Sequence, residues 1–153
     1  MIRFLVNRGQ RGSAGLPPPE LLDPGHLPGG GSSNSALAAP AGFQPPPDIV
    51  TRTYAGPPQA VFTAAQATAL SQPRTVLHRV FPDALQAHFV ARSAVLGFPD
   101  LIALQVLHGA DGGSQLVLWS RSVHGRYDFG VNHKRLVAWV SAIDAALPSQ
   151  GKP

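Results

Sequence analysis

The sequence from Leu101 to Leu147, LIALQVLHGADGGSQLVLWSRSVHGRYDFGVNHKRLVAWVSAIDAAL, contains the pattern that decides the fold. Residues 101–107 and 115–123 are each rich in apolar side chains, as strands are, and the glycine-rich loop 109–113 between them has the chemistry of a hairpin. From Asn132 onward, apolar side chains recur at helical spacing, at Leu136, Trp139, Val140, Ile143 and Leu147. Two antiparallel strands and a helix with one buried stripe therefore form the C-terminal half of the predicted domain.

Further predicted elements lie upstream of this stretch. The alternation of apolar and polar side chains in residues 48–54 predicts a strand. The alanine-rich segment 59–70 predicts a helix, because alanine favours helices and the proline before it suits a first turn. Residues 75–81 and 85–95 predict two more strands, with a turn between them.

The order of these elements predicts the fold class. One strand, a helix, four consecutive strands and a final helix (β-α-β-β-β-β-α) are connected mostly by short loops. Consecutive strands with short connections pair antiparallel, and two helices with apolar stripes must then cover one face of the sheet. We therefore expect an α+β domain that has an antiparallel sheet of about five strands and two helices packed on one face.

Proline and glycine divide the chain into an arm and a domain. Residues 1–58 contain 11 of the 16 prolines and 9 of the 16 glycines. Because proline fixes φ and lacks an amide donor, proline clusters favour extended structure and oppose helices and central strands. We expect a Pro/Gly-rich extended arm at residues 1–44, the α+β domain at 45–148 and a short tail at 149–153.

The composition excludes several classes of protein. The chain of 153 residues has no cysteine, so disulfides, thiolate metal sites and cysteine nucleophiles are excluded. Its net charge of +4 is a weak field, which predicts no nucleic-acid partner. No apolar run reaches the roughly 18 residues that span a bilayer, and the apolar start of the chain is too short for a secretory signal. We expect a cytoplasmic protein without a transmembrane segment.

Signatures of catalysis and of cofactor binding are missing from the sequence. It contains no G-x-S-x-G nucleophile motif, no phosphate-binding glycine loop and no H-E-x-x-H pattern. The six histidines lack the spacing of metal ligands, although an antiparallel hairpin could bring His78 and His88 near one another. The sequence therefore predicts no cofactor and no metal, and it favours a protein that is not an enzyme.

Two arginines lie late in predicted strands, among apolar neighbours. Arg92 lies late in the strand predicted at 85–95, and Arg121 lies late in the strand predicted at 115–123. A partly buried arginine reaches water along its stem or pairs with a carboxylate, and Asp100 and Asp128 are the natural partners. The group is then either a charge network that ties loops to the sheet or a site that binds an anion.

The segment SRSVHGRYDFGVNHKR at residues 120–135 resembles a motif of the domain-of-unknown-function family numbered 1499, S-x-S-R-x-G-x-x-D-x-G-x-N-x-x-R. The first half is offset, and the remainder agrees at Gly125, Asp128, Gly130, Asn132 and Arg135. Upstream, the segments 91–93 and 98–100 are similar to a strand and a turn of that family, whereas its cysteine-containing P-N-C-V segment has no counterpart here. The resemblance covers about residues 48–147. It implies the family's fold and leaves the activity open, because the family has none assigned.

The motif also has a physical explanation of its own. Asn132 suits the N-cap of the final helix, and the positive end of the helix dipole would favour Asp128. The same helix start and its arginines could hold an anion. The candidate binding residues are Arg92, Asp100, Ser120, Arg121, Ser122, Gly125, Asp128, Gly130, Asn132 and Arg135.

Two functions are consistent with these patterns. Sparse charge, an apolar proline-rich arm and the missing catalytic groups favour a non-catalytic interaction or accessory protein whose arm docks on a protein partner. The alternative is a small-molecule binding domain, with an apolar ligand between sheet and helix or an anion at the corner of Arg92, Arg121 and Asp128. An arm laid on apolar surface would favour the first function, and an apolar cavity of roughly 300 Å³ or more would favour the second.

Overall fold

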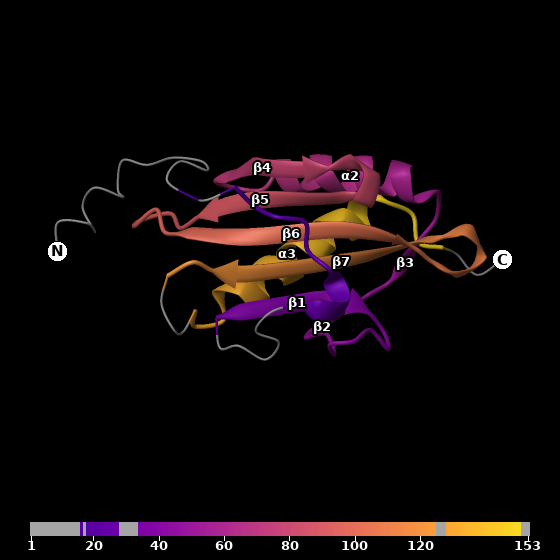
Figure 1. The fold of residues 1–153 in the computed structure, drawn as a ribbon, viewed down its shortest axis with the longest axis horizontal. Coiled ribbons are helices and arrows are strands. Elements are labelled where there is room, and N and C mark those ends of the chain that lie inside the picture. The colour runs from indigo at the N-terminus through magenta and orange to yellow at the C-terminus, as the bar shows by residue number, and fades with distance from the viewer. Residues whose placement is uncertain (1–15, 17, 28–33, 125–127, 151–153) are drawn as a thin grey trace.

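A single sheet separates two differently covered faces of the molecule (Figure 1). The computed structural model describes residues 16, 18–27, 34–124 and 128–150. Both helices lie on one side of the sheet, and the N-terminal arm, defined here as residues 18–27, crosses the other side (Figure 1). These two faces are called the helix face and the arm face below.

The described residues form seven strands and two α-helices. The strands are β1 (Ser35–Pro40), β2 (Ile49–Thr51), β3 (Thr53–Tyr54), β4 (Thr75–Phe81), β5 (Gln86–Arg92), β6 (Pro99–His108) and β7 (Ser114–Ser122). The helices are α2 (Pro58–Leu70) and α3 (Val131–Ala146). Three short 3-10 helices are η2 (Pro24–His26), η3 (Pro82–Ala84) and η4 (Ala110–Gly112).

The sheet has the strand order β2-β1-β7-β6-β5-β4, and β3 also pairs with β7. Strands β4 to β7 form an antiparallel meander, while β1 and β2 pair parallel. The predicted α+β class, the meander and the two helices on one face are therefore confirmed. The strand predicted at residues 48–54 is instead two short strands that pair with different neighbours.

Strand β1 lies inside the segment that the sequence assigned to the arm. It pairs with β2 on one side and with β7 on the other, and residues 36–40 are buried. Its sequence SALAAP has no alternation and is poor in β-branched residues, so local propensity does not predict a strand. Pairing on both sides overrides that propensity. A segment that precedes residue 45 therefore belongs to the sheet.

The helix face is a continuous apolar core. Helix α3 packs on β1 and β7, and α2 packs on β6 and on α3. Trp139 of α3 is buried, as the apolar stripe predicts, and meets Phe89 of β5 edge-on with ring centroids 5.6 Å apart. No helix in the described part of the chain is long and apolar enough to cross a membrane.

The arm face carries a smaller apolar cluster. Its buried residues are Leu37, Ala39, Val117 and Trp119, from β1 and β7. Leu22 and Leu27 of the arm pack against this cluster. These arm residues, whose placement the sequence left open, therefore lie along the surface of the domain.

Candidate functional site

The predicted motif forms a buried polar cluster, here called the polar corner, which consists of Asp100, Ser120, Ser122, Asp128, Asn132 and Arg135. Asn132 of α3 lies at its centre and is fully buried. Its side-chain oxygen accepts from Ser120 Oγ at 2.6 Å and from Arg135 Nη1 at 2.8 Å. Its side-chain nitrogen lies 2.9 Å from both Ser122 Oγ and Asp128 Oδ2. One amide therefore connects β7, the loop before α3 and the helix itself.

Arg135 completes the polar corner. Its Nη2 atom lies 2.7 Å from Asp100 Oδ2 of β6, and both side chains are mostly buried. Among the described residues, every buried side-chain nitrogen or oxygen has a hydrogen-bond partner. A fully paired network of this kind favours a structural role, because it leaves no buried group free for a ligand.

Gly130, rather than the expected Asn132, is the N-cap residue of the final helix, and the Asp128 carboxylate pairs with the backbone amides there. That carboxylate accepts from the backbone amides of Gly130 at 2.8 Å and of Asn132 at 3.2 Å. Gly130 precedes the helix with a φ of 79°, a left-handed conformation that favours glycine. Burial raises the pKa of Asp128, but hydrogen bonds from the Asn132 side chain and from the two amides outweigh it, so the pKa lies below its ordinary value.

The two strand arginines make contacts away from the polar corner. Arg92 donates from Nη1 to the carbonyl of Gly97 at 2.9 Å, so it ties its strand to the following loop. Arg121 lies over the Trp119 ring, 4.9 Å from the ring centroid. Alternation along β7 places Arg121 on the arm face, opposite Ser120. The predicted candidate Gly125 lies outside the described residues.

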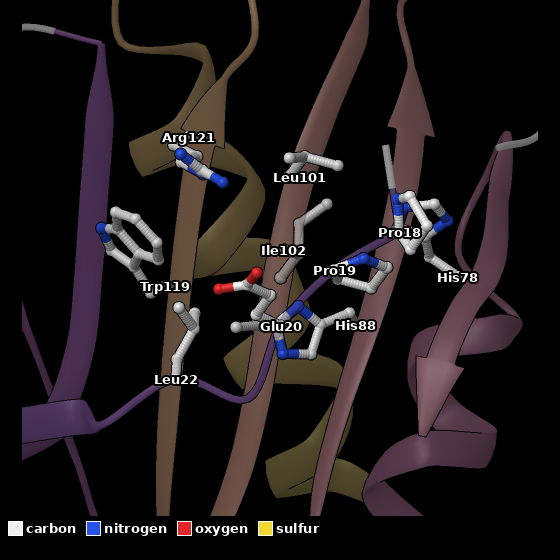
Figure 2. A pocket seen from close by; sticks show the side chains of 11 residues that line it. Pro18, Pro19, Glu20, Leu22, His78, His88, Leu101, Ile102, Trp119 and Arg121 are labelled. Atoms are coloured by element: carbon white, nitrogen blue, oxygen red, sulfur yellow. The ribbon is translucent and has the colours of Figure 1, made fainter. Parts of the chain in front are cut away.

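A cavity of about 260 Å³ lies between the arm and the sheet (Figure 2). The arm contributes Pro18, Pro19, Glu20 and Leu22 to its wall. The strands contribute His78, His88, Leu101, Ile102, Ala103, Trp119 and Arg121. Arg121 is the one predicted candidate in this wall, and its neighbours there were outside the predicted set.

Gln86 attaches the arm to the sheet. Its side chain is buried, and its oxygen accepts from the backbone amide of Leu22 at 2.9 Å. Its nitrogen donates to the carbonyl of the same residue, also at 2.9 Å. Arg79 adds a contact from Nη1 to the carbonyl of Pro19 at 3.2 Å. The sheet therefore recognises the arm partly through its main chain.

His88 supports Gln86 from inside the cavity. Its Nε2 atom lies 2.7 Å from Gln86 Oε1. Because that oxygen can only accept, neutral His88 carries its hydrogen on Nε2. Burial, followed by the positive charges of His78, Arg121 and Arg79, lowers the pKa of His88 from 6.5 to about 4. His88 is therefore neutral at physiological pH, so the hydrogen-bond chain from His88 through Gln86 to Leu22 carries no charge.

Sequence patterns predict only some of the residues that line the cavity between the arm and the sheet. Alternation in β7 places Trp119 and Arg121 together, and the predicted proximity of His78 and His88 agrees with their place in one cavity wall. No group of three or more histidine, aspartate or glutamate side chains that could hold a metal occurs in the described residues. Gln86 has no local signal, since its role depends on an arm that lies 64 residues away in sequence.

The fold and these contacts define an α+β domain that has a closed helix face and an arm laid on its second face. A family model described as "Protein of unknown function (DUF1499)" matches residues 28–143. The chain therefore belongs to this family, which confirms the resemblance seen in the motif. The match includes β1 to β7 and begins after the arm. No curated protein matches the chain significantly.

Proposed function

We propose that the protein is a non-catalytic interaction protein that binds an extended segment of a protein partner on its arm face. The pair of hydrogen bonds between Gln86 and the backbone of Leu22 carries this proposal. A side-chain amide that donates to and accepts from one residue's main chain recognises extended structure, whatever the side chain at that position. The arm is then an internal ligand that shows which segments the face accepts.

Apolar contacts supply the selectivity that main-chain bonds lack. Leu22 and Leu27 pack on the cluster that contains Leu37, Val117 and Trp119. Main-chain hydrogen bonds combined with pockets for spaced side chains are the usual means by which proteins bind extended peptides. The partner segment is therefore expected to be extended, to contain proline, and to present leucine-like side chains five residues apart.

The position of the arm outside the family match also supports a role in binding a partner segment. The arm face is built from strands inside the family match, whereas the arm precedes it. In the described residues, the polar corner is fully paired and offers no free catalytic group. The helix face is filled by the apolar core. The arm face, in contrast, is covered by the arm, which lies outside the family match. A segment of another protein that competes with the arm can therefore bind in its place.

A peptide with the sequence of residues 16–27, LPPPELLDPGHL, tests the proposal. The full-length double variant Leu22→Asp and Leu27→Asp should release the arm, because two charges cannot pack on the apolar cluster. A fluorescent form of the peptide should bind this variant, and a scrambled peptide should not. Adding Gln86→Leu to the variant should weaken binding by roughly tenfold, the effect of one lost pair of hydrogen bonds.

Fluorescence anisotropy gives the affinity, and a thermal melt verifies that each variant is folded. A folded double variant that fails to bind the peptide would contradict the proposal. Equal affinity for the scrambled peptide would contradict it as well, because the face would then lack the expected selectivity.

A further inference from the structure

The cavity between the arm and the sheet remains when the arm is in place. Its volume of about 260 Å³ lies just below the roughly 300–1,000 Å³ of sites for drug-sized ligands. Most of the wall is apolar, with Pro19, Leu101, Ile102 and Trp119 among the lining residues. A compact ligand with an apolar body, such as one ring, fits a space of this size and lining.

Arg121 gives the cavity a positive charge at one side. Its guanidinium lies over the buried Trp119 ring, so one face of the group is covered and its N–H edges remain available. None of the ion pairs between described residues includes Arg121. Arg121 is exposed overall, but partial burial against the strand lowers its pKa, so part of its guanidinium is shielded from water. An anion beside it would offset the cost of that partial desolvation.

Glu20 shows that a carboxylate can enter the cavity. Its side chain extends from the arm into the space between Trp119 and His88 (Figure 2). None of the ion pairs within the described part of the chain includes Glu20, so Glu20 and Arg121 share the cavity wall without a direct ion pair. Since Glu20 is an exposed residue of the arm, it can turn toward water when another carboxylate arrives.

We propose that the arm-covered cavity binds a small organic carboxylate with a single ring. Its carboxylate pairs with the Arg121 guanidinium, and its ring packs among Trp119, Leu101 and Pro19. Arginine suits this role because its planar edge matches the two oxygens of a carboxylate. Glu20 disfavours the same ligand by like-charge repulsion and so limits its affinity.

This site is separate from the proposed partner interaction. The carboxylate binds while the arm lies on the sheet, whereas a partner segment replaces the arm. A protein that binds the peptide but no carboxylate would leave the interaction role intact, and the reverse outcome would leave the cavity site intact.

Benzoate and benzamide are matched probes for the full-length protein. They share the ring and differ in charge, so calorimetric titration should show binding of benzoate and at least tenfold weaker binding of benzamide. Arg121→Gln should weaken benzoate binding by at least tenfold, and Glu20→Gln should strengthen it several-fold. Arg52→Gln is the control, because Arg52 also lies over an aromatic ring, 5.3 Å from the Tyr54 centroid, and is outside the cavity wall.

Three outcomes would overturn the proposal. Wild-type protein that does not bind benzoate at millimolar concentration excludes the site. Equal affinities for benzoate and benzamide exclude charge recognition. Unchanged benzoate binding by Arg121→Gln excludes this arginine. If Arg121→Gln does not fold, Glu20→Gln still decides, since an exposed arm residue should not affect folding and unchanged affinity there places the carboxylate elsewhere.

Discussion

The two faces of one sheet are closed in different ways. On the helix face, side chains from the strands interlock with α2 and α3 around fully buried residues such as Leu136 and Ile143. On the arm face, four buried residues form the cluster, and an extended segment with one short 3-10 helix lies over it. Helices α2 and α3 are therefore part of the folded core and stay packed on the sheet. The arm face is closed by few contacts, which a competitor can replace.

The two tryptophans show the same difference. Trp139 and Trp119 are 3% and 5% exposed, so burial alone does not distinguish them. Trp139 packs among core elements and also lines a smaller cavity of about 170 Å³, whereas the arm cavity and Leu22 border Trp119. Two residues with nearly the same exposed fraction can thus be buried by segments that differ greatly in local stability, here the helices and the arm.

Deletion of N-terminal residues should have the largest effect on stability and should separate the roles of the two faces most clearly. A chain without residues 1–27 should still melt cooperatively, because the family match and β1 both follow that point. A chain without residues 1–44 should lose its cooperative transition, since β1 is an interior strand between β2 and β7. Circular dichroism melts of both proteins measure this. A cooperative melt after the longer deletion would show that β1 is dispensable and that the domain begins at residue 45, as the sequence predicts.

Substitution of the two tryptophans should give the next largest effect. Trp139→Ala should lower the free energy of unfolding by about 3–5 kcal/mol, because the rigid core cannot close around the space left by the ring. Trp119→Ala should cost less, about 1–2 kcal/mol, since the arm can move into the gap. Denaturant titrations measure both values. Equal losses would mean that the arm is as firmly packed as the helices.

The sequence predicts the helix face better than the arm face. Repeats at helical spacing locate α3 and its buried stripe, and the hairpin signal locates β6 and β7, because these patterns are local. Strand β1 escapes prediction, since its alanines and Pro40 join the sheet through partners that follow later in the chain. The path of the arm escapes for the same reason, because Gln86 and Leu22 are far apart in sequence.

The sequence names several residues that lie together in the structure, but it does not predict which face of the sheet each of them occupies. Asp100, Ser120 and Arg135 meet at the polar corner, as a network tying loops to the sheet requires. Arg121 was grouped with Asp128, but β7 places Arg121 and Ser120 on opposite faces, and the wall that Arg121 joins includes Glu20 from the arm. Successive residues of a strand point to opposite faces. Strand β7 therefore contributes Ser120 to the polar corner on one face and Arg121 to the cavity on the other.

Asp128→Asn tests whether the polar corner belongs to the folded core. The variant loses the negative charge at the helix start and weakens its hydrogen bonds to the amides of Gly130 and Asn132. We expect the free energy of unfolding to fall by about 1–3 kcal/mol, with or without phosphate. Denaturant melts in both buffers measure this. An unchanged midpoint, with phosphate stabilising only the wild type, would instead indicate an anion site at the corner.

Acidification should weaken the arm face through His88, with the smallest of the four effects. The pKa of His88 is lowered from 6.5 to about 4 in the folded protein, so as the pH falls below 6.5 the unfolded chain takes up a proton that the folded protein does not. The free energy of unfolding therefore decreases between pH 6.5 and pH 4. We expect about 1–2 kcal/mol, less than the full shift implies, because the side chain borders the cavity and solvent screens its charge.

His88→Gln isolates this contribution. Glutamine does not titrate, and its amide can donate to Gln86 Oε1 in place of His88 Nε2. The carboxylates Asp23 and Asp128, whose pKa values are also lowered, lose stability on acidification in both proteins, so they cancel in the comparison. Denaturant titrations of wild type and variant at pH 7 and pH 4.5 give the difference. If both proteins lose the same stability, protonated His88 is accommodated under the arm, and the arm face tolerates a positive charge at this position.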